Sequence, residues 1–447
     1  MREPQSLFPP HDAMGLMTDF YELTMAAGYF SLGHNPKAVF EAFVRTLPVN
    51  RQYLIAAGLE QAIHYLTNIQ FGSEQIDWLK RNEVFQNVDK GFWDYLSNFK
   101  FSGDMWAVPE GTVVFANEPL VRIEGTLLEC QLLETYLLTT LNIQTLVATK
   151  SARICKAAEG RAVVDFGARR AHGPHAGLLA TRASYIGGCI GTSNVYASQV
   201  LGIKAVGTQA HSWIMSFESE EQAFEDYARI FPDNAICLID TYDTIEGAKR
   251  AAKLGKRLKA VRLDSGNLVE QSKRVRKLLD DAGLVDVKII ASSDLNEYTI
   301  SEMLANGAEI DFFGVGTDMV TSKDAPALSV VYKLVEIEEK GRNKPVRKFS
   351  SDKATFGGAK QIFREVDANG KFTGDVVGLA DESINGNPIL KKVIDKGKLI
   401  AELPCLDDIR NYAMNQLDSL PVCLFSLRGN AYYPVKLSER LIEYNGY

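Results

Sequence analysis

The chain has 447 residues, of which 46% are hydrophobic and 23% charged, with a formal net charge of −7. This length predicts two or three domains, and the apolar content is sufficient for a large core. The acidic balance argues against a nucleic-acid-binding surface, which needs clustered basic residues, and no apolar run reaches the length of a membrane span.

The six cysteines form no C-x-x-C pair, and most of them lie inside apolar runs such as Ile236–Leu238. Free, buried thiols in a reducing compartment are the expected state. The first ten residues lack the apolar region of a secretion signal. We therefore expect a cytoplasmic protein without a membrane anchor.

The first third of the chain mixes helix and strand patterns without a regular rhythm. Thr18 and Asp19 can cap a helix that runs from Phe20 to Phe30. Further helices are predicted at 56–68, 73–82 and 89–98, and strands at 39–44, 113–115 and 120–123. A long helical pattern then covers residues 128–158, with a break expected near Asn142.

The middle of the chain repeats one pattern, a short apolar run that ends in polar residues. The runs are 162–165, 205–208, 236–240, 260–264, 288–292 and 312–317, and helices are predicted between them at 176–189, 219–231, 243–254, 267–282 and 295–306. Alternating strands and helices predict a parallel sheet, and barrels of this kind carry their active site at the carboxyl ends of the strands. Because six strands are fewer than eight, either less regular stretches supply the rest or the barrel is open.

After residue 335 the repeat stops. Residues 336–347 have the pattern of a charged hairpin, and strands are predicted at 361–364 and 375–378. We expect an α/β protein of three parts: an N-terminal mixed domain (1–127), an irregular (β/α) barrel that carries the catalytic site (128–335), and a C-terminal segment (336–447) that packs back on the first domain.

The strand ends carry the candidate site residues. Asp264 and Asp294 could hold a ribose diol or Mg²⁺ with its waters, and Arg262 could bind a carboxylate or phosphate through two hydrogen bonds. The alternative is an internal Arg262–Asp264 salt bridge, since residues two apart on a strand share one face. Asp240 and Asp243 are interpreted first as helix caps.

Two further strand ends favour anions. Arg169 and Arg170 follow the run 162–165 and suit a pyrophosphate, although a structural pairing with acidic neighbours remains open. Gly314 and Gly316 lie where late barrel strands often bind phosphate, but close strand packing would also explain them.

His211 follows the run 205–208 and is flanked by hydroxyl residues. A histidine in this place can act as a base, a metal ligand, a phosphoryl acceptor or simply a packing residue. No second histidine lies at the spacing of a zinc site, so a structural metal is disfavoured.

Taken together, these motifs resemble those of the nicotinate phosphoribosyltransferase family. They are TDFYELTM (Thr18–Met25), FGARR (Phe166–Arg170), GTQAHS (Gly207–Ser212), VRLDSG (Val261–Gly266) and GVGT (Gly314–Thr317), in the family's order and at compatible spacing. The likeness covers most of the chain and is weakest after residue 370. The stretch Thr355–Lys360 departs from the family pattern at Phe356-Gly357-Gly358, which leaves the role of this loop and of Lys360 open.

The resemblance implies a type II phosphoribosyltransferase fold and a homodimer whose subunits share active sites. The implied reaction joins nicotinate to 5-phosphoribosyl-1-diphosphate, gives nicotinate mononucleotide and pyrophosphate for NAD salvage, and consumes ATP through a phosphohistidine at His211, with Mg²⁺ as cofactor. It places Asp264 and Asp294 in catalysis, with Mg²⁺ near them. It assigns to nicotinate Tyr21, Thr208, Arg262, Phe166 and Ser184, and to the phosphoribosyl and phosphate groups Arg169, Arg170, Ser292, Gly314, Gly316 and Thr317.

Relatives that use nicotinamide or quinolinate are the rival hypotheses. Nicotinamide users have an acidic side chain near the position of Ser184, whereas quinolinate users would need additional cations and no His211. A Schiff-base aldolase is disfavoured because Lys204, Lys259 and Lys288 lie at strand starts, not strand ends. A non-catalytic scaffold would not be expected to carry reactive side chains at every strand end.

Overall fold

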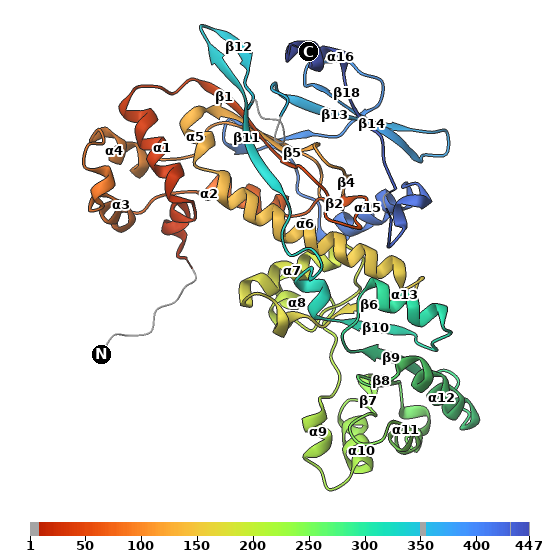
Figure 1. Cartoon of the computed structure of the whole chain (residues 1–447). Coiled ribbons are helices and arrows are strands. Elements are labelled where there is room, and N and C mark those ends of the chain that lie inside the picture. The colour runs from red at the N-terminus through yellow and green to blue at the C-terminus, as the bar shows by residue number, and fades with distance from the viewer. Residues whose placement is uncertain (1–8, 349–354, 430, 447) are drawn as a thin grey trace. The chain divides into compact units, whose positions relative to one another are not determined.

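The computed structural model describes residues 9–348, 355–429 and 431–446, which form two compact units. Unit 1 comprises residues up to Thr145 together with Ala327–Ser426 and the C-terminal residues from 431 onward, and unit 2 comprises Leu146–Pro326 with Leu427–Gly429 (Figure 1). Both chain ends thus belong to one unit, and the stretch 327–335 lies in unit 1. Within the described ranges, no helix combines the length and apolar character needed to cross a membrane.

Unit 1 is built mainly on antiparallel sheet, with one parallel strand pair at the edge of its smaller sheet. Its largest sheet has the strand order β12-β11-β1-β5-β3-β16-β17, and a smaller one has the order β15-β13-β14-β18. The strands are β1 (Lys37–Val44), β2 (Leu54–Ile55), β3 (Asp104–Ala107), β4 (Val113–Val114), β5 (Pro119–Thr126), β11 (Val330–Glu339), β12 (Arg342–Pro345), β13 (Lys360–Val366), β14 (Phe372–Leu379), β15 (Asn387–Pro388), β16 (Lys391–Asp395), β17 (Lys398–Leu399) and β18 (Val435–Leu437). The charged hairpin predicted at 336–347 is confirmed as β11 and β12, which pair antiparallel.

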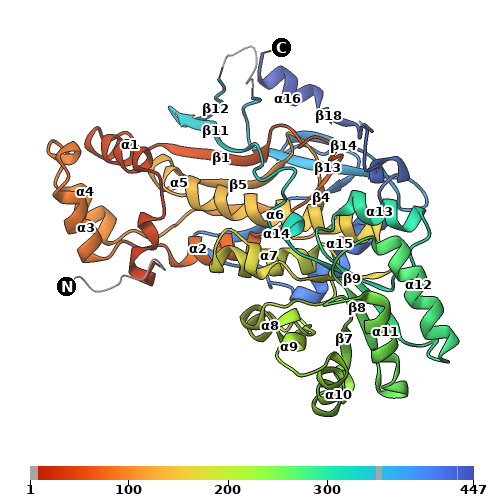
Figure 2. The same ribbon diagram turned by 60° about the horizontal axis from the view of Figure 1, so that its bottom comes forward.

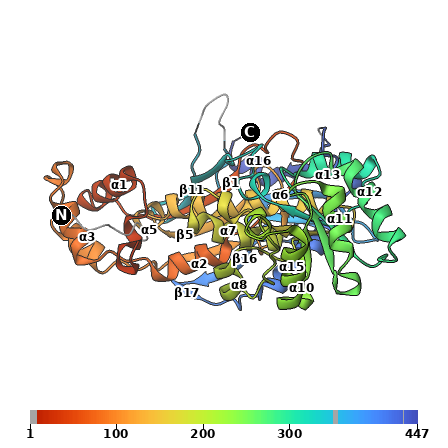
Figure 3. The same ribbon diagram turned by 90° about the horizontal axis from the view of Figure 1, so that it is seen from below.

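The helices of unit 1 are α1 (Phe20–Ser31), α2 (Leu59–Asn68), α3 (Ser73–Lys80), α4 (Gly91–Ser97), α5 (Leu127–Gln131), the first half of α6 (Glu134–Ala157), α15 (Leu406–Asp418) and α16 (Glu439–Tyr444). Helices α1, α3 and α4 gather at one end of this unit (Figure 3). The predicted helix Phe20–Phe30 is confirmed as α1.

The N- and C-terminal parts of unit 1 are joined by buried charged contacts. The Lys360 ammonium lies 2.7 Å from a carboxylate oxygen of Glu41 in β1 and also donates to the carbonyls of Phe356 and Gly358. Arg122 in β5 donates to the Lys360 carbonyl at 2.6 Å. Because its ammonium is fully engaged inside unit 1, Lys360 holds two strands together.

Unit 2 contains a parallel sheet of order β6-β10-β9-β8-β7, with the active-site candidates at its carboxyl ends. Strands β7, β8 and β9 follow one another beside the helices α11 and α12 (Figure 2). The strands are β6 (Ala162–Asp165), β7 (Ile236–Leu238), β8 (Ala260–Leu263), β9 (Lys288–Ser292) and β10 (Phe312–Val315). The helices are the second half of α6, α7 (Pro174–Ile186), α8 (Val195–Leu201), α9 (His211–Met215), α10 (Glu220–Ile230), α11 (Thr244–Ala252), α12 (Leu268–Asp281), α13 (Glu297–Ala305) and α14 (Thr317–Val320). Five of the six predicted runs are therefore confirmed as strands of one parallel sheet.

The prediction of a regular strand at Ala205–Thr208 is wrong. Ala205 forms only a single-residue parallel bridge with Thr192, which in turn bridges Asp165 at the end of β6. On its other side this segment is linked to the turn before β7, since the Asn234 side chain donates to the Gly207 carbonyl at 3.0 Å. The sheet is thus an irregular barrel, because these bridges and side-chain contacts replace a continuous ladder.

The predicted helix break near Asn142 is also wrong. Helix α6 runs without interruption from Glu134 to Ala157, and the break lies earlier, between α5 and α6. The Asn142 amide oxygen instead accepts a hydrogen bond from the backbone N–H of Leu328 at 2.7 Å. A residue with weak helix propensity is retained here because it satisfies a distant backbone group.

Candidate active site

Arg262, near the end of β8, is the centre of the polar cluster at the strand ends. Its Nε donates to the Ser292 hydroxyl at 2.7 Å, one terminal nitrogen donates to the Thr208 hydroxyl at 2.9 Å and to the Gln209 carbonyl at 3.1 Å, and the other meets Asp264 at 2.7 Å. A guanidinium has five N–H donors, so four are engaged and one remains. Arg262, Thr208, Asp264 and Ser292 are called the Arg262 cluster below.

Asp240 organises the loop that follows β8. One of its carboxylate oxygens accepts from the Asp264 N–H at 2.8 Å and from the Ser265 hydroxyl at 2.7 Å. Asp240 is therefore not a helix cap, whereas Asp243 is confirmed as the cap of α11, accepting from the N–H groups of Ile245 and Glu246. The other oxygen of Asp240 is buried and has no hydrogen-bond partner among the described residues.

Asp264 is held in its ionised form. Burial acts to raise the pKa of its carboxyl, but the Ser292 hydroxyl, the Arg262 guanidinium and His211 together lower it below the ordinary value. The Ser292 hydroxyl donates to the same Asp264 oxygen that Arg262 contacts. The second oxygen is left facing His211.

His211 is the first residue of α9, and its side chain is 39% exposed. Its Nδ1 lies 3.1 Å from the Thr241 hydroxyl, and its Nε2 lies 3.8 Å from the Asp264 carboxylate. Thr241 thus fixes the ring from one side, while Nε2 remains near a carboxylate at the accessible edge. This geometry suits a nucleophile or proton carrier better than a buried packing residue.

The end of β6 is built by a buried aspartate. Asp165 accepts from the Gly167 N–H at 2.8 Å and from the hydroxyls of Thr181 and Thr192 at 2.8 and 2.9 Å. Burial raises the pKa of its carboxyl, although these hydrogen bonds oppose the shift. The turn that carries Phe166 and the two arginines is therefore fixed from beneath.

Phe166 packs between the Arg262 cluster and β10. Its ring centroid lies 5.7 Å from the Arg262 guanidinium carbon. A Cβ added at Gly314 would come within 2.4 Å of the Phe166 ring, whereas one at Gly316 would approach only backbone, at 3.3 Å. Close packing against Phe166 is thus sufficient to explain the glycine at 314.

Arg169 and Arg170 are exposed at the end of this turn. Among the described residues neither has an ion-pair partner, so pairing with acidic neighbours does not account for them there. Thr317 follows β10 and begins α14, directly beside the predicted phosphate glycines. These three side chains are available to an anionic ligand.

Asp294 faces a different space from Asp264. It lines a cavity of about 330 Å³ bounded by the start of α12 and by α13, together with Gly266 and Asn267. The residue before it, Ser293, has a left-handed backbone with φ of 145°, a conformation that side chains other than glycine rarely adopt. Such strain is often found at functional turns.

Ser184 and Tyr21, the remaining residues predicted to bind nicotinate, make no hydrogen bond to the Arg262 cluster among the described contacts. Ser184 in α7 is 1% exposed and donates to the Thr181 carbonyl at 2.9 Å. Tyr21 belongs to unit 1 and is 45% exposed, and the pKa of its phenol is raised by burial and by the carboxylates of Glu134 and Glu22. Glu22, fully buried, accepts from both the N–H and the hydroxyl of Thr135 and so anchors α1.

Sequence reasoning missed three contributors to the site: Asp240, Thr241 and Gln209. Asp240 ends its apolar run as Asp264 does, which was a usable signal. Thr241 and Gln209 had none, since their roles depend on contacts with His211 and Arg262. Gln209 is 4% exposed and supplies a backbone carbonyl to Arg262.

Comparison with known proteins gives one consistent result. Family models described as the nicotinate phosphoribosyltransferase N-terminal domain, family and C-terminal domain match residues 16–142, 161–365 and 383–445. The chain is 44% identical to nicotinate phosphoribosyltransferase pncB2 of Mycobacterium tuberculosis, over 96% of this chain and 92% of that protein. It is 40% identical to nicotinate phosphoribosyltransferase of Bacillus subtilis, over 96% of this chain and 94% of that protein.

Solved structures agree with the sequence relatives. The crystal structure of human nicotinic acid phosphoribosyltransferase superposes with a TM-score of 0.84 at 29% identity, covering 95% of this chain and 98% of that one. The nicotinate-nucleotide pyrophosphorylase of Pyrococcus furiosus superposes with a TM-score of 0.77 at 28% identity, covering 93% and 99%. The expected irregular barrel with a mixed α/β domain is thereby confirmed.

Proposed function

This chain belongs to the nicotinate phosphoribosyltransferase family, and we propose that it joins nicotinate to 5-phosphoribosyl-1-diphosphate. The products are nicotinate mononucleotide and pyrophosphate, which place the reaction at the start of NAD salvage. The observation that carries the proposal is the Arg262 cluster, because it gathers a cation, a carboxylate and hydroxyls from neighbouring strand ends of the barrel beside an accessible histidine.

The chemistry requires charge stabilisation more than proton transfer. When the bond from ribose C1 to the diphosphate breaks, the sugar acquires positive charge and the leaving group carries the negative charge. The pyridine nitrogen is already a nucleophile, so no strong base is needed. Asp264, ionised by its neighbours, can stabilise the sugar, while Arg169 and Arg170 can receive the diphosphate.

Arg262 acts in this proposal mainly by organising its neighbours. Since four of its five donors are engaged, it cannot grip a carboxylate through two hydrogen bonds without releasing Thr208, Ser292 or Asp264. One free N–H and the Thr208 hydroxyl together can meet the nicotinate carboxylate. Phe166 gives the pyridine ring an aromatic neighbour.

ATP consumption is proposed to pass through His211. Its Nε2 would attack the γ-phosphorus of ATP, the bond to ADP would break, and water would later cleave the phosphorus–nitrogen bond to release phosphate. The Thr241 contact supports this assignment because it occupies Nδ1, whereas Nε2 lies 3.8 Å from the Asp264 carboxylate, beyond hydrogen-bond distance. We expect His211→Asn to abolish acid-labile labelling from γ-labelled ATP and to leave slow, ATP-independent transfer. Labelling that persists in this variant would assign the acceptor role to another residue.

Mg²⁺ is proposed to accompany the diphosphate. Among the described residues, no group of three or more carboxylate, histidine or cysteine side chains could hold a metal ion alone. Mg²⁺ commonly needs only one or two carboxylates beside substrate phosphates. The unpartnered oxygen of Asp240, next to Asp264, fits that requirement, and Asp294 is the second candidate. When bound, the ion would neutralise the leaving group.

The functional unit is proposed to be a homodimer in which Tyr21 completes the partner's nicotinate site. Tyr21→Ala and His211→Asn homodimers should each be impaired. Refolding an equal mixture should give about half hybrids, each with one intact site, and therefore about a quarter of wild-type ATP-coupled activity. A mixture no more active than the mean of its parents, with hybrids verified by mass, would place Tyr21 in its own subunit's site or outside it.

The direct test is a product assay with nicotinate, nicotinamide and quinolinate in parallel, each with the phosphoribosyl donor and with or without ATP. Nicotinate should be converted fastest, with ATP stimulation. A nucleotide-forming reaction with another pyridine acid or amide is the alternative that the same assay tests. Conversion of quinolinate or nicotinamide alone would overturn the proposal.

A further inference from the structure

The loops that follow β9 and β10 are neighbours, because these strands pair in parallel through Gly314 and Ser292. One loop carries Asp294 and the other begins α14 at Thr317. Both residues are predicted to meet the phosphoribosyl donor. The spacing between these two loops therefore decides whether the donor can be held by both.

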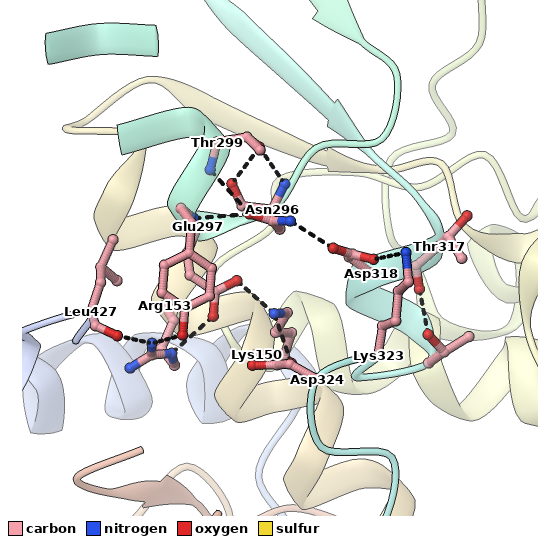
Figure 4. A network of polar contacts seen from close by, with 12 residues as sticks. Lys150, Arg153, Asn296, Glu297, Thr299, Thr317, Asp318, Lys323, Asp324 and Leu427 are labelled. Carbon is pink, nitrogen blue, oxygen red and sulfur yellow. Dashed lines mark hydrogen bonds and ion pairs between the residues drawn. The ribbon is translucent and has the colours of Figure 1, made fainter. Parts of the chain in front are cut away.

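A single amide connects the two loops. The Asn296 side-chain oxygen caps α13 by accepting from the N–H groups of Tyr298 and Thr299, both at 3.0 Å. Its Nδ2 donates to a carboxylate oxygen of Asp318 at 2.7 Å (Figure 4). Because the cap fixes the amide oxygen, the amide nitrogen must face α14. Among the standard side chains of this length, only asparagine supplies an acceptor and a donor together.

Asp318 is the second residue of α14 and its side chain is 13% exposed. Its other contact is an ion pair of 3.4 Å with Lys323, whose side chain is 67% exposed and screened by solvent. Asn296 is thus the sheltered partner of Asp318. Because Asp318 directly follows Thr317 in α14, fixing Asp318 also fixes Thr317. The Thr317 carbonyl is held further within this turn, since it accepts from the Thr321 hydroxyl at 2.7 Å.

The amide is itself held from behind. Glu297, the next residue, has a fully buried side chain between Lys150 at 2.6 Å and Arg153 at 3.0 Å, both on α6 (Figure 4). Arg153 also donates to the Leu427 carbonyl at 3.2 Å, and Lys150 meets Asp324 at 2.8 Å. These contacts hold the start of α13 against α6. The position of Asn296 is therefore set by α6 and does not depend on α14.

We propose that Asn296 and Asp318 are positioning residues that set the distance between the two donor-binding loops. The proposal rests on the proposed function, because it assumes that Asp294 and Thr317 bind the phosphoribosyl donor. An active-site group displaced by about 1 Å can cost a factor of about 100. The bridge would hold the loops in place before the donor arrives, and it would not touch the donor itself.

The decisive variants exchange the two groups of the bridge. Asn296→Asp keeps the acceptor that caps α13 but sets two carboxylates face to face. Adding Asp318→Asn restores one amide opposite one carboxylate, with the roles reversed. Lys323→Ala is the matched control, since it removes the exposed contact of Asp318 and leaves the bridge intact.

The measurements are the Kd of the enzyme for 5-phosphoribosyl-1-diphosphate by calorimetry, the KM of each substrate and the melting temperature. Asn296→Asp should raise the donor Kd and KM by about 10–100-fold and the nicotinate KM by less than about 3-fold. The double variant should return the donor values to within about 3-fold of wild type, and Lys323→Ala should stay within about 2-fold.

Three results would overturn the bridge proposal: an unchanged donor Kd in Asn296→Asp, equal losses for both substrates together with a lower melting temperature, or a double variant as impaired as the single one. The donor Kd needs no turnover. If the wild type binds the donor but converts no nicotinate, the proposed function fails, while the bridge is still judged by the Kd values.

Discussion

Two charged clusters in unit 2 differ mainly in how much solvent they meet. In the Arg262 cluster the side chains of Arg262 and Asp264 are 13% and 28% exposed. In the cluster of Lys150, Arg153 and Glu297, called the Glu297 cluster, they are 1%, 2% and 0% exposed. Both clusters pair arginine with a carboxylate, so residue type alone does not separate them.

The difference in exposure indicates that the Glu297 cluster and the Arg262 cluster have different roles. A buried ion pair that loses one partner leaves an uncompensated charge in a medium of low polarity, so it serves to fix elements in place. The Arg262 cluster is partly exposed, keeps one guanidinium N–H without an acceptor among the described residues, and lies beside the accessible imidazole of His211. It can therefore exchange its contacts for those of a ligand. We therefore interpret the Glu297 cluster as part of the scaffold and the Arg262 cluster as part of the site.

The strongest way to break this comparison is to neutralise Glu297. Glu297→Gln keeps the side-chain size but leaves Arg153 buried without this carboxylate and leaves Lys150 with the partly exposed Asp324 as its remaining ion-pair partner. The free energy of unfolding in urea should fall by about 3–5 kcal/mol. As a control, Lys277→Ala removes an exposed pair with Asp281 and should change it by less than about 0.5 kcal/mol. A loss below about 1 kcal/mol for Glu297→Gln would mean that the buried pair contributes no more than a surface pair.

Removing Arg262 should damage catalysis more than folding. Losing its charge-assisted contacts should cost about 2–4 kcal/mol, which lowers kcat/KM for nicotinate by about 30–1000-fold. The donor Kd should rise by less than about 5-fold, because Arg169 and Arg170, which are proposed to receive the diphosphate, lie outside the hydrogen bonds of Arg262. Arg262→Lys, which keeps the charge without the planar fork, should recover only part of the activity. Equal losses for both substrates would support a salt bridge that merely closes the barrel mouth.

The pH dependence of stability should show whether the partly exposed Asp264 is ionised in the folded protein. The pKa of Asp264 is lower in the folded protein than in the unfolded chain. Its contribution is therefore fully present above the unfolded value of about 4 and is lost as the pH falls through the folded value. The stability difference between wild type and Asp264→Asn should stay constant from pH 7 to about 5 and shrink below about 4. A difference that does not vary with pH in this range would count against an ionised Asp264.

The smallest effect is expected at Ser184. Its hydroxyl is buried and already donates to the Thr181 carbonyl. Ser184→Ala should lower stability by about 1 kcal/mol or less and change kcat/KM for nicotinate by less than about 3-fold. Ser184→Asp would bury a carboxylate and lose stability, so it cannot by itself test the choice between acid and amide. A large, selective loss of nicotinate use in Ser184→Ala would instead assign this hydroxyl to the substrate.

The sequence by itself determined where most of the barrel strands lie along the chain and which residues stand at their ends. A short, continuous apolar run is typical of a strand that is buried on both faces of a parallel sheet. This local pattern was sufficient to predict the strands Ala162–Asp165, Ala260–Leu263 and Lys288–Ser292. The motifs at their ends also pointed to the family, because their residue types, order and spacing resemble those of its members.

The tertiary structure alone decided which polar residues meet. Ala205–Thr208 has a strand pattern, but its neighbours offer one bridge and side chains in place of a ladder. Asp240 has the pattern of a helix cap and instead holds the loop after β8. Asn296 caps its own helix, and the fold adds the contact to Asp318 across the neighbouring loop. Hydrophobic periodicity is a local property of the chain. A hydrogen-bond partner 22 residues away, as for Asn296 and Asp318, or 54 residues away, as for Arg262 and Thr208, is instead set by how the elements pack. The contacts of this site therefore depend on the tertiary structure.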